Sequence, residues 1–119
     1  MSVSYSSIEL LGYLGQDPRA IHTASGTQGA RFSLAVNRVW TDESAGRRED
    51  TDWFTVVAWE RLAENCLAHL SKGSLVFVVG KPRIQQWTEK KGVRREQIHV
   101  LAEQVVFLNK LESGEVQEE

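Results

Sequence analysis

The chain has 119 residues, of which 41% are hydrophobic and 25% charged, and its formal net charge is −2 at pH 7. This composition is typical of one soluble globular domain, and no apolar run is long enough to cross a bilayer, so we expect neither a membrane protein nor a second domain. The single cysteine, Cys66, excludes an internal disulfide, and the opening residues lack the pattern of a secretory signal, so we expect a cytoplasmic protein.

The first half of the chain has the two-residue periodicity of strands. Ile8–Gly15 is an apolar run that ends before Pro18, and residues 20–23 form a second, brief extended segment. The clearest half-buried strand is residues 31–37, in which large apolar side chains alternate with polar or small ones. Residues 41–50 are polar, and we expect them to form a long loop that serves function or is mobile.

Residues 51–60, TDWFTVVAWE, predict a strand with two different sides. Alternation places Phe54, Val56 and Ala58 on one side of this strand. The other side carries Trp53, Thr55, Val57 and Trp59. The first side suits a core, whereas the second separates two large rings by about 20 Å, six residues at roughly 3.3 Å each. This second side is either covered by another part of the protein or serves as a stacking surface.

One helix is expected, because apolar side chains recur at helical spacing in residues 60–70 and Gly73 suits the C-cap. Leu75–Val79 then suits a buried strand that continues into a basic segment. Residues 88–92 predict the turn of a long hairpin with the return strand 93–101, and residues 105–108 a last short strand. About five strands, with the helix between the third and fourth, indicate an all-β OB-fold, a five-stranded Greek-key barrel.

Charge is distributed unevenly along the chain. Residues 1–111 contain 14 basic and 12 acidic residues, whereas residues 112–119 contain four acidic and no basic ones. We expect residues 1–111 to form the OB-fold domain and residues 112–119 to be a short, acidic, disordered tail. Within the domain, residues 81–95 contain six basic residues against Glu89 alone, with Trp87 among them. Lys81, Arg83, Gln85 and Trp87 alternate onto one side of the expected strand.

The sequence offers little for catalysis. His22, His69 and His99 are far apart and none lies in a metal-ligand pair, while Cys66 falls on the apolar side of the expected helix. The glycines of GYLG and SGTQG lack the spacing of a phosphate-binding loop. We therefore expect no enzymatic activity, no cofactor and no metal.

The tryptophans and the cations together favour single-stranded nucleic acid as a ligand. Unpaired bases expose flat apolar surfaces that stack on aromatic rings, at about 1–3 kcal/mol per base with little sequence preference, while the phosphates need positive charge. A duplex hides the base surfaces. The chain has four tryptophans, and none lies within an apolar run that would bury it fully.

Several stretches of the chain resemble the bacterial single-stranded DNA-binding protein (SSB) family. The resemblance extends from about Ser7 to Leu108 and rests on LGYLGQDPR, RFSLAVNRVW, TDWFTVVAWERLAE, LSKGSLVFVVGKPR and QQWTEKKG, in that order. It implies an OB-fold that assembles as a homotetramer and protects single-stranded DNA during replication, recombination and repair, with no enzymatic activity and no cofactor. The final residues, ESGEVQEE, lack the acidic Pro-Phe tip through which the family recruits replication and repair proteins.

The resemblance also implies where DNA binds. The aromatic positions that stack on bases correspond to Trp40, Trp53, Trp59 and Trp87, and Lys72 and Arg83 match basic positions. We add the cations that flank the rings to the expected phosphate contacts. These are Arg38, Lys81, Arg94 and Arg95.

Two alternatives remain open. An OB-fold protein that binds RNA, or a primosome-type accessory protein, would share the fold and the basic hairpin. A protein-interaction module would instead bury its tryptophans against another subunit. The acidic residues between Trp40 and Trp53 keep this second alternative open; they are Asp42, Glu43, Glu49, Asp50 and Asp52.

Overall fold

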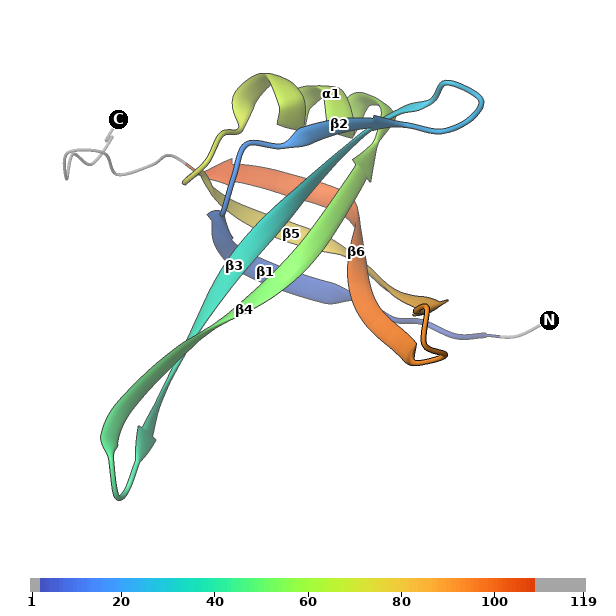
Figure 1. Cartoon of the computed structure of the whole chain (residues 1–119). Helices are drawn as coiled ribbons and strands as arrows, with labels where there is room; N and C mark the ends of the chain where they lie inside the picture. The colour runs from blue at the N-terminus through green and yellow to red at the C-terminus, as the bar shows by residue number, and fades with distance from the viewer. Residues whose placement is uncertain (1–2, 109–119) are drawn as a thin grey trace, which may run out of the picture.

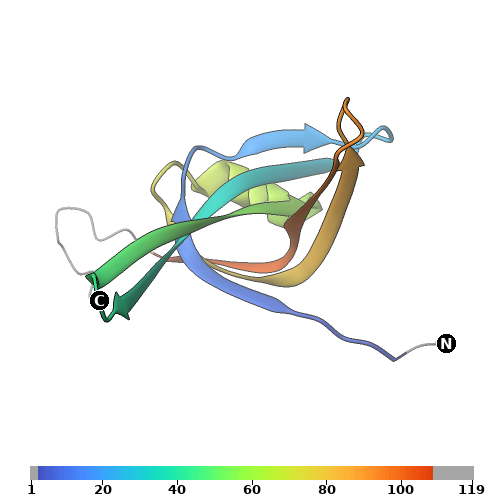
Figure 2. The ribbon, with the colours of Figure 1, turned by 60° about the horizontal axis from the view of Figure 1, so that its bottom comes forward.

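The computed structural model describes residues 3–108, which form six strands and one helix (Figure 1). In chain order the elements are β1 (Ile8–Leu14), β2 (Arg19–His22), β3 (Gln28–Asp42), β4 (Gly46–Trp59), α1 (Glu60–His69), β5 (Leu75–Thr88) and β6 (Arg94–Leu108). The two longest hairpins, β3–β4 and β5–β6, diverge from the body of the molecule (Figures 1 and 2), and α1 lies at the end opposite their tips (Figure 1).

Five of the strands close into a barrel. The order β1-β5-β6-β4-β3 is completed by pairing of β1 with β3, where Tyr13 lies opposite Ala35 and Leu14 opposite Leu34. The β4–β6 pair is parallel and the other pairs are antiparallel, while the short β2 is added to β3 outside this closed ring. The helix lies between the third and fourth strands of the barrel. The predicted all-β OB-fold is therefore confirmed.

The barrel interior is filled by one side of each strand. On β4, Val56 and Ala58 are fully buried and Phe54 packs against the core, as the alternation in TDWFTVVAWE predicts. The helix covers one end of the barrel with its apolar side, to which Cys66 belongs. Burial raises the pKa of the Cys66 thiol to about 11, so the thiol stays protonated and serves as a core side chain.

The structure corrects two predicted elements. Residues 41–50 are not a long loop, because β3 and β4 stay paired as far as Asp42 and Gly46, with a turn of only three residues between them. This ribbon projects beyond the barrel with water on both sides, which explains why its residues are polar. The predicted strands 93–101 and 105–108 are one continuous strand, β6, whose pairing with β5 shifts register between Val79 and Gly80.

Two further predictions concern the C-terminal tail and the absence of a membrane-spanning segment. The expected acidic tail, residues 112–119, and the domain boundary at residue 111 lie outside the described residues. Within residues 3–108, no helix combines the length and the apolar character needed to span a bilayer.

Candidate nucleic-acid interface

One side of the sheet, here called the outer side, carries most of the predicted binding residues. On β4 it carries Trp53, Thr55, Val57 and Trp59. Across β6, His99 lies beside Thr55 and Leu101 beside Val57. The next strand, β5, places Arg83 beside His99 and Lys81 beside Leu101. Because directly paired residues point to the same side of a sheet, these side chains form one continuous surface over β4, β6 and β5.

The outer side continues along the β5–β6 hairpin. Gln85 is paired with Gln97, and Trp87 is paired with Arg95 close to the turn. The predicted alignment of Lys81, Arg83, Gln85 and Trp87 is thus present in the structure. The outer side as a whole thus unites three tryptophans with three of the predicted cations, Lys81, Arg83 and Arg95.

Two glycines explain how Trp53 and Trp59 lie on this surface. A Cβ atom added to Gly15 would be 2.6 Å from the Trp53 ring, and one added to Gly29 would be 2.6 Å from the Trp59 ring. Each ring therefore occupies space that any other residue would fill. Neither glycine was a candidate from the sequence, because the contact joins residues that are about 30 or more positions apart.

The tryptophans of the outer side differ in accessibility. Trp53 is 61% exposed and Trp87 45% exposed, whereas Trp59 is half-buried and lies over Gly29 towards Ile21. The rings on β4 and β5 thus offer a flat apolar area to solvent that a base can cover.

Trp40 stands apart from the other three tryptophans. It lies on the β3–β4 ribbon, paired with Arg48, and register places it on the side opposite that of Trp53. Its ring is 43% exposed, and the guanidinium carbon of Arg38 lies 5.2 Å from the ring centroid. The structure therefore separates Trp40 from the outer side while leaving its ring accessible.

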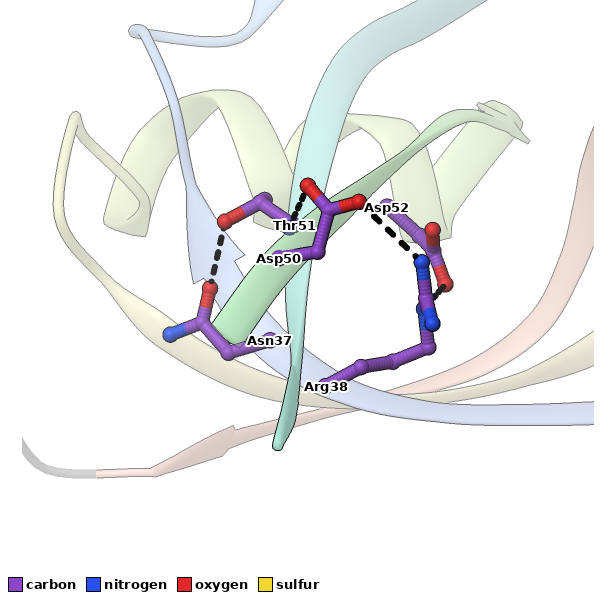
Figure 3. Close-up of polar contacts among 5 residues, drawn as sticks. All are labelled: Asn37, Arg38, Asp50, Thr51 and Asp52. Atoms are coloured by element: carbon purple, nitrogen blue, oxygen red, sulfur yellow. Dashed lines mark hydrogen bonds and ion pairs between the residues drawn. The ribbon is translucent and has the colours of Figure 1, made fainter. Parts of the chain in front are cut away.

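Arg38 is also held by two carboxylates (Figure 3). Its Nε donates to Asp52 Oδ2 at 2.9 Å, and its Nη2 donates to Asp50 Oδ2 at 3.2 Å. On the other side of the ribbon, the Thr51 hydroxyl donates to Asn37 Oδ1 at 2.8 Å. Arg38 is thus occupied by acids of its own chain, which the sequence alone did not reveal.

The remaining predicted cations fall into two groups. Lys81 Nζ lies 3.8 Å from Glu103 and 5.0 Å from the Tyr5 ring centroid, and Arg95 Nε lies 3.1 Å from Glu89. The second group has no ion pair within residues 3–108, and it consists of Lys72, Arg83 and Arg94. Arg94 points to the side opposite Trp87, where its Nη2 donates to Gln86 at 2.9 Å.

A shallow groove of about 330 Å³ crosses the outer side between Trp59 and Arg83. Val57 and Leu101 provide apolar lining, and Gln85 and His99 provide polar groups. Burial, and to a smaller extent the positive charge of Arg31, lower the pKa of His99. This histidine was not a candidate from the sequence, although the register places it at the centre of the surface.

The histidines and acids do not gather into a metal site in the part of the chain that the structure describes. No group of three or more histidine, cysteine, aspartate or glutamate side chains is arranged there to hold a metal ion. His69 packs instead against Phe107, with 6.0 Å between the ring centroids.

Comparison with known proteins relates this surface to a family. The sequence profile of the single-strand binding protein family matches residues 5–108. The single-stranded DNA-binding protein 1 of Chlorobaculum tepidum is 31% identical over 115 residues, which cover 96% of this chain and 71% of that protein. The single-stranded DNA-binding protein of Thermotoga maritima is 35% identical over 114 residues, covering 96% of this chain and 81% of that protein.

A solved structure, described as the Plasmodium falciparum SSB complex with ssDNA, has the same fold. Its TM-score is 0.81 at 24% sequence identity, and the match covers 92% of this chain and 99% of that one. The family match spans nearly all of the described residues, including every strand of the barrel. The chain therefore belongs to the single-strand binding protein family.

Proposed function

We propose that this protein binds single-stranded DNA with little sequence preference and protects it during replication, recombination and repair. The observation that carries this proposal is the exposure of Trp53 and Trp87 on the same outer side as Arg83, a cation with no ion pair within residues 3–108. Exposed rings and a cation without an ion pair on one surface match the two chemical features of a single strand of DNA, its base surfaces and its phosphates.

The proposed mechanism combines stacking with charge. Bases stack on Trp53, Trp59 and Trp87, while Arg83 and the neighbouring cations contact phosphates. The family consists of binding proteins, as its name and those of the relatives state, and this bears out the expectation of a non-enzymatic protein. We place its action in the cytoplasm, in association with the nucleoid, where single-stranded DNA arises when a chromosome is copied or repaired.

A homo-oligomer, in line with the expected tetramer, is part of the proposal. The supporting surface is another part of the outer side, on β1, β5 and β6 away from the hairpin tip, where Leu11 is 54% and Tyr13 49% exposed. Register places Leu11 beside Phe77, which is paired with Val106, so apolar side chains from three strands adjoin. A contiguous apolar sheet surface of this kind favours association with a second copy. Sedimentation of Leu11→Glu beside the wild type tests this, since a charge there should dissociate the oligomer.

The first test of DNA binding is tryptophan fluorescence during titration with oligo(dT), repeated with a duplex of equal length. Strong quenching by the single strand alone, weaker at higher salt, supports stacking on exposed rings. Absence of quenching by either ligand, in a folded sample, favours the protein-interaction alternative. Titration with oligo(dU) and oligo(U) separates DNA from RNA binding, because only the 2′-hydroxyl differs between them.

A further inference from the structure

A pair of arginines lies between the positions of the two β4 tryptophans. Arg19 on β2 and Arg31 on β3 are directly paired in the antiparallel ladder, so both side chains point to the same side of the sheet. Arg31 is in turn paired with Val57 on β4, which lies between Thr55 and Trp59 on the outer side. The two arginines therefore extend the outer side across β3 onto β2, away from the basic β5–β6 hairpin.

The two guanidinium groups are not neutralised by an ion pair in the described chain. Neither Arg19 nor Arg31 forms an ion pair within residues 3–108, although both side chains are exposed. Like charges directly opposite each other on neighbouring strands destabilise a sheet. An anion placed between them removes this repulsion, and a phosphate accepts the paired N–H groups of guanidinium well.

The arginines line an open hollow of about 290 Å³. Besides Arg19 and Arg31, the hollow offers the hydroxyl of Ser33 and the amide of Gln16 as donors. Its one acidic lining residue, Asp17, uses Oδ1 to accept a hydrogen bond of 2.8 Å from the backbone N–H of Lys72. The hollow is thus lined mainly by groups that bind an anion.

The hollow lies between the two ring positions. Gly15, which lies against Trp53, donates its N–H to the Ser33 carbonyl at 3.1 Å, and Ser33 lines the hollow. On the other side, Arg31 is two residues from Gly29, over which Trp59 lies. A DNA strand whose bases stack on both rings spans the distance between them, and the hollow lies where a phosphate of the connecting backbone can reach it.

We propose that Arg19, Arg31 and Ser33 form a backbone-phosphate site for the nucleotides that connect bases stacked on Trp53 and Trp59. The inference rests on the proposed function and adds a contact that neither the sequence nor the family resemblance assigned. It predicts that part of the salt dependence of DNA binding comes from β2 and β3, outside the basic β5–β6 hairpin.

The test is the salt dependence of oligo(dT) affinity in the double variant Arg19→Gln/Arg31→Gln. Each phosphate contact contributes about −0.7 to the slope of log affinity against log salt, so the loss of this one site should flatten the slope by about 0.7. Arg31→Lys, which keeps the charge, should retain most of the slope. The matched control is Arg47→Gln, because Arg47 is exposed but paired with Glu49 at 3.5 Å; its slope should equal that of the wild type.

The outcomes separate this inference from the function on which it rests. If the wild type binds oligo(dT) and the double variant keeps the same slope, the phosphate site is wrong and DNA binding stands. If the folded wild type binds no single strand, the proposed function fails and the site fails with it. Thermal unfolding of the double variant checks its folding, and its Tm should equal or exceed that of the wild type because the repulsion is gone.

Two additional ligands identify the source of the phosphate. An oligomer with uncharged methylphosphonate linkages should bind the wild type and the double variant equally well, because it has no charge for the arginines to contact. Inorganic phosphate alone, titrated by calorimetry, tests a free anion as the ligand. Tight phosphate binding that the double variant loses, together with an unchanged oligomer slope, would overturn the strand site in favour of a free-phosphate site.

Discussion

Replacing Trp53 with alanine should weaken binding of single-stranded DNA while leaving the domain folded. The ring is 61% exposed and its covered part lies over Gly15. Stacking of one base contributes about 1–3 kcal/mol, which corresponds to a loss of affinity of about 5- to 150-fold.

The cost to stability follows from the covered part of the ring. A buried indole removes up to about 250 Å² from water, so the roughly two fifths that Trp53 covers amounts to about 100 Å². At about 25 cal/mol per Å², this area corresponds to a loss of about 2.5 kcal/mol in the free energy of unfolding. The value is an upper bound, because an extended-chain reference overstates the surface that the unfolded protein exposes. That is less than the 5–15 kcal/mol by which domains of this size are usually stable.

Fluorescence anisotropy of a dye-labelled oligo(dT) is the appropriate assay, because it does not depend on the tryptophan that is removed. Ile84→Ala is a matched control: Ile84 is 63% exposed but lies on the side of β5 opposite Arg83 and Trp87. Its removal should leave the affinity unchanged. Equal affinity of folded Trp53→Ala and wild type, or an equal loss in Ile84→Ala, would refute the assignment of the outer side.

Three further predictions concern neighbouring residues. Phe54→Ala should lower the free energy of unfolding in urea by about 2–3 kcal/mol, less than for a fully buried phenylalanine, and leave the affinity of the folded protein nearly unchanged. The folded state lowers the pKa of His99, so the unfolded chain binds the proton more readily and the free energy of unfolding falls as pH drops below about 6.5. His99→Asn should therefore reduce the difference between the free energies of unfolding measured in urea at pH 7.5 and at pH 5, and an undiminished difference would contradict this. Arg38→Gln should leave the salt slope of oligo(dT) binding unchanged, because two aspartates already occupy its guanidinium; a slope flatter by about 0.7 would show that phosphate displaces them.

The parts of the structure that could be predicted depend on local alternation. In TDWFTVVAWE the contrast between Phe54 and Trp53 is contained in the sequence itself, because neighbours in a strand point to opposite sides. The order of strands around α1 was likewise enough to indicate the barrel. The length of β3 and β4 was not predictable in this way, since residues 41–50 have water on both sides and no apolar periodicity marks their pairing.

The parts of the site that the sequence did not reveal depend on contacts between distant residues. Gly15 and Gly29 accept tryptophan rings from β4, and nothing in their own segments indicates this. Arg19 and Arg31 are separated by a turn and become neighbours only through the register of β2 and β3. From the sequence, Arg38 is predicted to contact DNA because it lies near Trp40. In the structure, Asp50 and Asp52 lie across the ribbon on β4 and accept hydrogen bonds from its guanidinium group.

The two long hairpins have opposite charge, and this constrains the path of DNA. Residues 37–53 contain three basic and five acidic residues, and all three arginines there are paired with acids. Residues 81–99 contain six basic and two acidic residues, and four of the cations have no ion pair within residues 3–108. Phosphates are repelled by the first hairpin and attracted by the second. On the proposed function, a DNA strand that reaches Trp40 should therefore contact the β3–β4 ribbon through its bases, while its backbone follows the cations of β5, β6 and, by our inference, β2.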